Sequence, residues 1–262
     1  MRKNFSILLH TMQLFLFPEE NGCIFCGKKV YEESFCQKCW AELSLGKKQE
    51  FCRICGRLVK NICSFGCSEC QDSHYQFSFA RAAGGYQGIH RDILHQFKYI
   101  GKQSLAQPMG KLMVDVILSD RRYEGTQVIV PVPLAPAKLA QRKFNQSRLL
   151  AEELGKTLGL PVLSEGLRRG RNTQTQAKLS REERRTNLEG VFEVPAGKLQ
   201  QWKRKKLLLV DDVFTTGSTA SEATKVLLAA GVGEVTVITW ATGSTMLNER
   251  ERRDWCEFKE LS

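Results

Sequence analysis

The segment from Leu207 to Ala220 (LLLVDDVFTTGSTA) constrains the fold more than any other part of the chain. Its apolar start is typical of a buried strand, and two adjacent acids, Asp211 and Asp212, end that run. A loop rich in hydroxyl groups follows, and an amphipathic helix is expected to begin at Ser218. A strand that leads through a tight loop into a helix is the unit from which parallel α/β sheets are built.

Further strands and helices are expected on both sides of that segment. Strands are predicted at residues 80–86, 127–132, 206–210 and 234–240, and helices at 89–99, 105–118, 147–158 and 218–230. Pro108 is tolerated in the first turn of its helix, and Gly231 caps the last one. Strands separated by helices of this length predict an α/β domain over residues 76–246, with a parallel sheet flanked by helices.

The loop after Asp212 has the composition of a phosphate site. Gly217 lets the backbone turn so that successive N–H groups converge on an anion, and the helix N-terminus adds the positive end of its dipole. Hydroxyl donors come from Thr215, Thr216, Ser218 and Thr219. The two carboxylates would repel a phosphate, so they suit the hydroxyl groups of an attached sugar. The alternative is an ordinary strand-to-helix turn with a Thr or Ser N-cap.

Nine of the ten cysteines lie between residues 23 and 70, and eight of them form four CxxC pairs. A CxxC turn places two thiolates on one metal, and a second CxxC completes a closed tetrahedral zinc site with a structural role. The predicted ligands are Cys23, Cys26, Cys36 and Cys39 for one ion, and Cys52, Cys55, Cys67 and Cys70 for the other. Gly27 and Gly56 follow a CxxC, where a tight turn favours glycine.

Residues 21–75 form a module too small to bury much core, so it needs such metal staples. Buried reduced thiols, disulfides and ligands shared between the pairs are the alternatives, and Cys63 could replace Cys67. Cys256 is isolated and is expected to be simply packed.

The charge of the chain is uneven. Residues 76–262 hold 29 basic and 20 acidic side chains, against 10 and 8 in residues 1–75, and the net charge is +11. The surplus suits a polyanion such as pyrophosphate or nucleic acid, although a solvated basic surface would account for it as well. Arg142 could clamp a pyrophosphate or be a solvated loop residue. The segment from Arg168 to Arg185 could be a mobile lid over an anion or a disordered linker.

Both ends of the chain are expected to lie outside the α/β domain. Residues 1–20 are predicted to form an amphipathic helix, because His10, Thr11 and Gln13 interrupt the apolar run and no small-residue cleavage site follows. The run is too short for a transmembrane segment. We therefore expect a cytoplasmic protein, with a charged tail at residues 247–262.

The segment from Leu207 to Thr219 resembles the signature of the type I phosphoribosyltransferases, which is an apolar pair followed by Asp-Asp-x-x-x-Thr-Gly-x-Thr. The resemblance implies that Asp211 and Asp212 contact the ribose hydroxyls of phosphoribosyl pyrophosphate (PRPP). It also implies that residues from Thr215 to Thr219 hold the 5′-phosphate. Mg²⁺ would bridge the pyrophosphate and the ribose, and would keep mostly water and ligand oxygens around it.

Three more segments resemble the ComF/ComFC family of competence-associated proteins. They are VPVPLAPAKLAQRKFNQ at residues 130–146, Thr173-x-x-Gln176-x-x-Leu179 with Arg184 and Asn187, and Lys98-Tyr99-x-Gly101. This resemblance implies that Pro133, Arg142, Lys98 and Gln176 also line the PRPP site. Members usually carry glycine at the position of Lys143, which leaves the shape of that turn open. With the cysteine module, the resemblance covers nearly the whole chain.

Two functional hypotheses follow. In the first, the protein is a phosphoribosyltransferase of nucleoside metabolism, and an acceptor displaces pyrophosphate from the ribose through an oxocarbenium-like transition state. The acceptor and a general base are not evident, and neither is the catalytic cysteine of a complete glutamine-dependent amidotransferase. In the second, a binding or regulatory protein handles single-stranded DNA, together with other DNA-uptake proteins, in natural transformation. Phe144 and Tyr99 could stack on bases, but core packing is expected for both. A homodimer stays open.

Overall fold

A computed structural model describes residues 21–30, 34–46, 50–59, 66–71, 73–170 and 190–243 of the chain. The chain divides into two compact units, Met1–Leu45 and Gly46–Ser262. Several predictions lie outside the described residues, namely the helix at residues 1–20, the tail at residues 247–262, most of the proposed lid with Gln176, and Cys63 and Cys256.

The first unit contains one group of four cysteines. Strands β1 (Asn21–Gly22) and β2 (Lys29–Val30) form an antiparallel hairpin, and helix α2 (Gln37–Gly46) follows. Among the described residues of this unit, and apart from the cysteines, the buried apolar side chains are Val30, Phe35 and Leu43. So little apolar burial supports the expectation that this part of the chain depends on a bound metal.

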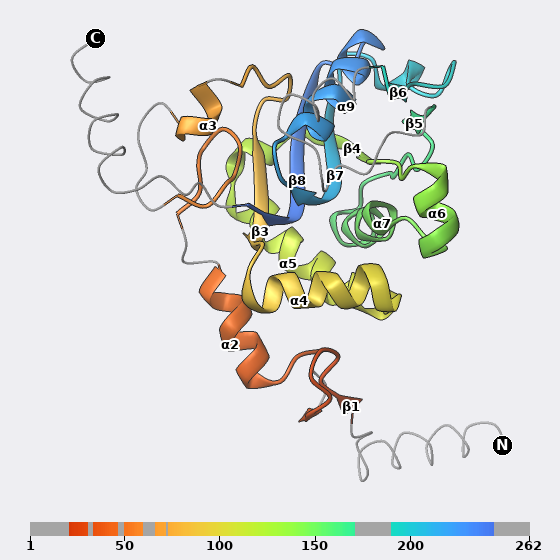
Figure 1. Ribbon diagram of the computed structural model, residues 1–262. Coiled ribbons are helices and arrows are strands. Elements are labelled where there is room, and N and C mark those ends of the chain that lie inside the picture. The colour runs from red at the N-terminus through yellow and green to blue at the C-terminus, as the bar shows by residue number, and fades with distance from the viewer. Residues whose placement is uncertain are drawn as a thin grey trace, which may run out of the picture. The chain divides into compact units, whose positions relative to one another are not determined.

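The second unit is built on a parallel sheet (Figure 1). Its strands are β3 (Ala80–Gly85), β4 (Thr126–Pro131), β7 (Lys206–Phe214) and β8 (Glu234–Thr242), in the order β3-β8-β7-β4. All three pairings between neighbours are parallel. A short antiparallel pair, β5 (Arg168–Arg169) with β6 (Phe192–Glu193), lies outside this sheet.

Helices connect and cover the strands. The α-helices are α3 (Ser68–Gln71), α4 (Gly88–His95), α5 (Ala106–Ser119), α6 (Pro136–Arg142), α7 (Gln146–Leu158) and α9 (Ser218–Ala229). The shorter turns are the π-helix η1 (Gln96–Ile100) and the 3-10 helices η2 (Gln103–Leu105), η3 (Arg121–Tyr123) and η5 (Gln200–Trp202). The prediction of a parallel α/β sheet flanked by helices is therefore confirmed.

The strands of the sheet are apolar because both of its faces are covered. Val128, Val130, Leu207 and Leu209 belong to one buried cluster with side chains of α9 and with three cysteines of the second group. Helices α5 and α7 contact each other as well as the sheet, α5 through β3 and β8 and α7 through β4 and β7. The second group of cysteines is thus part of the core of the α/β unit.

The structure differs from the sequence-based expectation at strand β7. The strand was expected to end at Val210, before the two acids, but it continues to Phe214 because it stays paired with β8 as far as Thr242. Asp211 and Asp212 therefore lie in the last part of the strand. Their backbone is held by the sheet, which fixes both carboxyl groups more firmly than a loop would.

Within the described residues, no helix is both long and apolar enough to cross a lipid bilayer.

Candidate functional site

The first group of cysteines has the geometry of a metal site. The Sγ atoms of Cys23, Cys26, Cys36 and Cys39 all lie within 4.8 Å of one another, and those of Cys26 and Cys36 are 3.6 Å apart. Four sulfurs at about 2.3 Å from one zinc ion would be about 3.8 Å apart in a tetrahedron. The four side chains therefore fit a structural zinc ion.

The second group has the same geometry and lies deeper. Its Sγ atoms also lie within 4.8 Å of one another, and three pairs, Cys52–Cys70, Cys55–Cys67 and Cys67–Cys70, are 3.7, 3.5 and 3.6 Å apart. Hydrogen bonds with its neighbours lower the pKa of the Cys52 thiol, and hydrogen bonds with Cys52 raise the pKa of Cys55 and Cys70. Four thiols this close cannot all ionise without a cation, so this cluster also fits zinc.

The two clusters begin with the same turn, which we call the knuckle. In the first knuckle the Cys23 amide donates to the carbonyl of Lys28, and the Gly27 amide donates to that of Cys23. In the second, Cys52, Gly56 and Arg57 repeat both hydrogen bonds. The φ angles of Gly27 and Gly56 are 77° and 69°, in the left-handed region, so the predicted need for glycine is confirmed at both.

The acidic pair lies at the carboxyl end of β7 and is held by polar contacts. Asp211 accepts a hydrogen bond from the buried hydroxyl of Ser147 at 2.9 Å, and Asp212 pairs with the Lys98 ammonium at 2.7 Å. Burial, followed by the charge of Asp212, raises the pKa of Asp211 to about 7. At neutral pH the Asp211 carboxyl is therefore protonated in a large fraction of the molecules.

The loop after β7 is compact. Gly217 has φ 81°, and helix α9 begins at the next residue. The hydroxyls of Thr216 and Ser218 are 2.9 Å apart, and the Ser218 amide donates to the Thr216 hydroxyl at 3.4 Å. No acceptor in the described part of the chain pairs with the amides of Thr216 and Gly217. The loop therefore presents free amides, hydroxyls and a helix N-terminus together.

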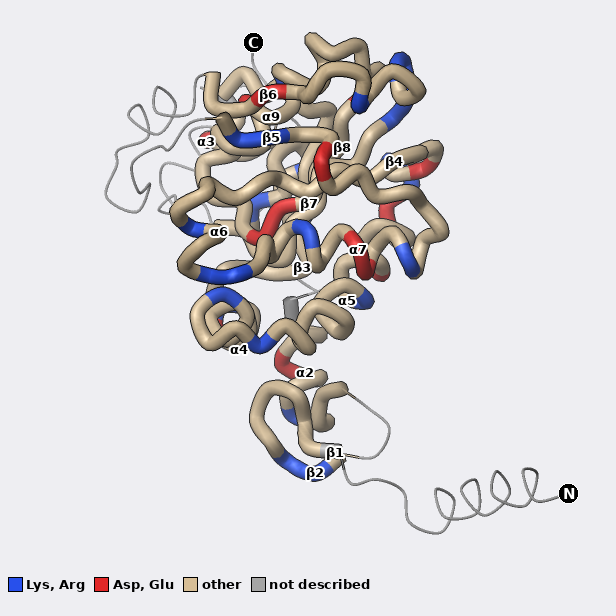
Figure 2. Tube along the Cα trace, turned by 90° about the vertical axis from the view of Figure 1, so that its right-hand side faces the viewer, with Lys and Arg blue, Asp and Glu red and all other residues tan. Residues whose placement is uncertain are grey.

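Basic side chains surround the acidic pair. Lys98 comes from the π-helical turn η1, and Arg142 at the end of α6 donates to Gln146 at 3.2 Å and lies over the Tyr99 ring at 5.2 Å. Figure 2 shows the acidic segment of β7 with basic segments of α6 and β5 near it. Of the remaining predicted residues, Pro133 is half-buried just after β4, and Thr215 and Thr219 are at least partly exposed.

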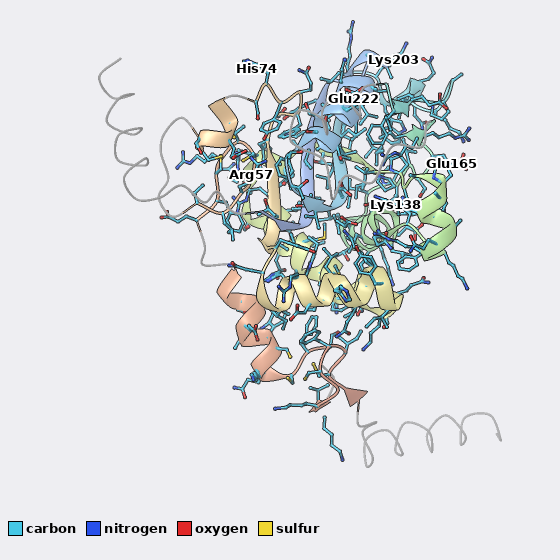
Figure 3. All side chains as sticks on the ribbon, in the orientation of Figure 1. Arg57, His74, Lys138, Glu165, Lys203 and Glu222 are labelled. Carbon is cyan, nitrogen blue, oxygen red and sulfur yellow. The ribbon has the colours of Figure 1, made fainter. Side chains whose placement is uncertain are left out.

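Two further basic residues near the acids were not singled out from the sequence. Burial, and then the charges of Arg142, Arg169 and Lys98, lower the pKa of Lys138, which lies on α6 (Figure 3). Burial also lowers the pKa of Arg169, and the charge of Asp211 opposes that shift. Lys138 lies inside the ComF-like segment at residues 130–146, which was the signal that could have identified it.

The turn at Lys143 keeps the shape that suits glycine. Lys143 has φ 64° and ends helix α6 in the left-handed conformation. The lysine is therefore accommodated without a different turn, at a cost of roughly 1 kcal/mol. Tyr99 differs from expectation, because 63% of it is exposed rather than packed in the core. Phe144 is half-buried and packs against Phe97 with ring centroids 5.6 Å apart.

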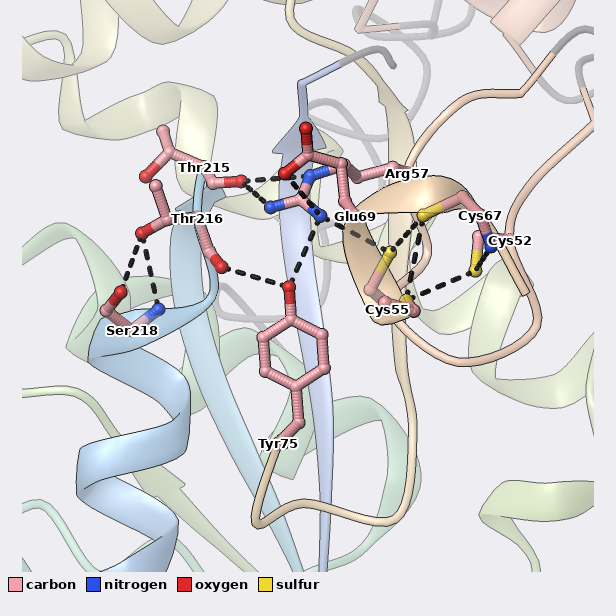
Figure 4. Close-up of polar contacts among 10 residues, drawn as sticks. Cys52, Cys55, Arg57, Cys67, Glu69, Tyr75, Thr215, Thr216 and Ser218 are labelled. Carbon is pink, nitrogen blue, oxygen red and sulfur yellow. Dashed lines mark hydrogen bonds and ion pairs between the residues drawn. The ribbon is translucent and has the colours of Figure 1, made fainter. Parts of the chain in front are cut away.

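Two residues of the cysteine module contact the loop and were also missed. The guanidinium of Arg57 donates to the carbonyl of Thr215, and the Tyr75 hydroxyl donates to that of Thr216 (Figure 4). These contacts join residues 158 and 141 positions apart in the sequence. No local pattern could have revealed them.

Comparison with known proteins agrees with this geometry. The family model described as "Double zinc ribbon domain" matches residues 12–72. Among solved structures, the chain is similar to the glutamine PRPP amidotransferase from B. subtilis complexed with ADP and GMP. That likeness has 20% identity and a TM-score of 0.35 over 52% of this chain and 26% of that chain, and no conclusion is drawn from it. The sheet and the cysteines define a parallel α/β protein with two four-cysteine clusters that fit zinc.

Relatives along most of the chain identify the family. The "DNA utilization protein YhgH" of Escherichia coli (strain K12) is 30% identical over 220 residues, 77% of this chain and 94% of that protein. The "Competence protein F" of Haemophilus influenzae is 27% identical over 82% of this chain and 94% of its own length. The "Competence protein ComFC" of Bacillus subtilis is 27% identical over 79% and 85%. The chain belongs to this competence and DNA utilization protein family.

Proposed function

We propose that this protein binds PRPP with Mg²⁺ at the carboxyl end of β7. The main supporting observation is that Asp211 and Asp212 lie near the carboxyl end of the strand β7. The loop that follows has two amides without an acceptor in the described part of the chain, and it leads into a helix N-terminus. A phosphate needs hydrogen-bond donors, and sugar hydroxyls suit carboxylate acceptors. The segment from Asp211 to Thr219 supplies both kinds of group.

Each part of the ligand has a matching group. The 5′-phosphate lies on the amides and hydroxyls from Thr215 to Thr219, and the ribose hydroxyls face Asp211 and Asp212. The pyrophosphate lies among the basic side chains, which are Lys98, Lys138, Arg142 and Arg169, beside Pro133. Gln176 lies outside the described residues and stays a predicted contact of this ligand. Mg²⁺, when bound, helps to neutralise the pyrophosphate as a leaving group.

The chemistry that fits this arrangement is transfer of the phosphoribosyl group. An acceptor nucleophile forms a bond to the anomeric carbon, and the bond from that carbon to pyrophosphate breaks, so that pyrophosphate leaves with the electron pair. The protein holds the ribose by its carboxylates while positive side chains balance the charge on the departing oxygens. The acceptor is not identified by any of these residues. Incubation with labelled PRPP and candidate acceptors would find it through the labelled product.

The binding test is a calorimetric titration with PRPP in the presence of Mg²⁺. We expect saturable binding to the full chain and at least about a 30-fold loss for Asp212→Asn, since a charge-assisted contact contributes about 2 kcal/mol or more. Asp92→Asn is the matched control, because this half-exposed acid on α4 forms an ion pair with the neighbouring Arg91 and lies outside the proposed site. An unmodified chain that does not bind PRPP would end the proposal.

A second function, handling of single-stranded DNA, is favoured by one observation. Tyr99 and Ile100 are 63% and 70% exposed, and Arg142 lies over the Tyr99 ring. An exposed aromatic ring next to cations is a platform for stacked bases. The name "DNA utilization protein" of one relative agrees with a DNA partner, and the cytoplasm is the compartment in which this function would act. Fluorescence anisotropy with labelled single-stranded DNA should show weaker binding for Tyr99→Ala, and unchanged binding for Asp212→Asn if the two sites are separate.

A further inference from the structure

Arg57 is an unusual residue in this fold. It is 4% exposed and is the only Lys, Arg, Asp or Glu that is buried in the described part of the chain. Its Nε donates to the Thr215 carbonyl at 3.1 Å, and its Nη2 donates to the same oxygen. Its Nη1 reaches the Tyr75 hydroxyl at 3.2 Å and the Cys55 sulfur at 3.7 Å. One guanidinium thus contacts a predicted zinc ligand and the phosphate loop at once.

Tyr75 forms the second half of the same connection. Its hydroxyl donates to the Thr216 carbonyl at 3.0 Å, and its ring stacks on Phe77 with centroids 4.8 Å apart. The ring also closes over Gly217, where an added Cβ would lie 2.6 Å from Tyr75 Cε1. Arg57 and Tyr75 therefore hold three consecutive residues of the loop (Figure 4).

These contacts decide where the loop amides point. The described chain has no cis peptide, and in a trans peptide the carbonyl of one residue points opposite to the N–H of the next. When Arg57 and Tyr75 hold the carbonyls of Thr215 and Thr216, the amides of Thr216 and Gly217 must point away from the cysteine cluster. Those two amides are available to an anion.

The cluster in turn positions Arg57. A divalent zinc ion with four thiolates has a net charge of about −2, which a neighbouring guanidinium and amide donors offset. Metal binding fixes the Cys55 sulfur as a charged acceptor for Arg57 Nη1. The Cys67 amide, donating to the Cys52 sulfur at 3.3 Å, shows the same kind of support within the cluster.

We propose that Arg57 and Tyr75 are positioning residues that couple the metal of the second cysteine cluster to the anion-binding amides of the loop at residues 215–219. Metal in that cluster then strengthens binding of the phosphate-bearing ligand, and the ligand slows loss of that metal. Thermodynamic linkage requires the ligand to raise the affinity for the metal by the same factor by which the metal raises the affinity for the ligand. This inference rests on the proposed PRPP site, and it assigns to the second cluster a role that a purely structural zinc would not have.

The first knuckle provides a matched control. Lys28 occupies the position in the first knuckle that Arg57 occupies in the second, with the same backbone hydrogen bonds. Lys28 is exposed. Lys28→Ala and Arg57→Ala therefore remove a basic side chain from the same turn, once without and once with a contact to the loop.

The test measures zinc release from the full chain to a chromogenic chelator, with and without PRPP and Mg²⁺. Cys26→Ser identifies the phase that comes from the second cluster. We expect PRPP to slow that phase at least about fivefold and to leave the other phase unchanged. We also expect Arg57→Ala and Tyr75→Phe to abolish this protection and to weaken PRPP binding by calorimetry at least about fivefold. Lys28→Ala should keep both effects.

The possible outcomes separate the two proposals. If the unmodified chain does not bind PRPP, the proposed function fails and this inference fails with it. If it binds PRPP but Arg57→Ala and Tyr75→Phe keep the original affinity and protection, only the coupling is refuted. Tyr75→Phe removes a single hydroxyl and keeps the ring on Phe77, so it decides the question even if Arg57→Ala does not fold.

Discussion

The two cysteine clusters use the same knuckle but have different surroundings. In the first, Lys28 is exposed and the cluster belongs to a unit with a small core of its own. In the second, Arg57 is buried, and three of the cysteines belong to the core of the α/β unit. The difference teaches that the same knuckle can stay local or can reach a distant loop. The deciding feature is whether its basic residue is exposed, as Lys28 is, or buried against that loop, as Arg57 is against Thr215.

The largest expected effect is on the two metal sites themselves. Cys55→Ser should lower the free energy of unfolding of the α/β unit by about 4 kcal/mol or more, because it opens a metal site inside that core. Cys26→Ser should leave the unfolding of the α/β unit unchanged and affect only the first unit. Hydrogen exchange of β7 and β8 distinguishes the two results, and metal analysis should fall from about two zinc ions per chain to about one in each variant. Equal hydrogen-exchange rates of β7 and β8 in the two variants would contradict the difference between the two clusters.

Alanine substitutions at the glycines of the two knuckles should have smaller effects, which also differ between the two units. An added Cβ at Gly56 would lie 2.6 Å from the carbonyl oxygen of Ala80, whereas nothing lies within 4 Å of one at Gly27. Gly56→Ala should therefore cost about 3 kcal/mol, from backbone strain and displacement of β3, and Gly27→Ala about 1 kcal/mol from strain alone. Denaturant titrations of both variants give the values. Similar losses of stability in the two variants would contradict the closer packing around Gly56 than around Gly27.

A pH titration tests whether the stability of the two units depends differently on pH, as it is expected to depend differently on metal binding. The pKa of Asp211 is raised to about 7 in the fold, above the unfolded value of about 3.9. The folded α/β unit therefore holds this proton to higher pH, and the contribution of Asp211 to its stability is fully present below about pH 4 and is lost as the pH rises through about 7. Asp211→Asn, which keeps an acceptor for Ser147, should remove about 2 kcal/mol of that decline.

Thermal melts of the wild-type chain and Asp211→Asn at pH 5 and pH 8 measure this effect. The Tm difference in favour of the variant should grow at pH 8 for the α/β unit, and the first unit should show no such difference. A Tm difference that does not depend on pH would contradict the raised pKa.

The smallest effect concerns a third left-handed position. Lys143 has φ 64°, close to the angles of Gly27 and Gly56, but it has a side chain. Lys143→Gly should stabilise the α/β unit by about 0.5 kcal/mol, since relief of strain outweighs the greater freedom of glycine in the unfolded chain. A denaturant midpoint that rises slightly, with an unchanged slope, would agree; a lower midpoint would show that this turn does not resemble those of the knuckles.

Much of the fold and the site could be predicted from local patterns. Helix α7, expected at residues 147–158, spans Gln146–Leu158, because its apolar spacing and the Asn145 cap are properties of neighbouring residues. The cysteine sets were recovered for the same reason, since a CxxC turn closes within a few residues. The end of β7 was misplaced because it depends on pairing with β8, which no local pattern reports.

The amino-acid sequence by itself determined the local chemistry, which comprises two sets of four cysteines, an acidic pair after an apolar run, and a glycine where the loop turns. Each of these features depends on residues close together in the sequence, so the local sequence suffices to predict them. Only the folded chain decided that Arg57, and not Lys28, would be buried beside Thr215. Burying a charged group is favourable only where distant segments supply its hydrogen-bond acceptors, and that arrangement exists only after the chain has packed.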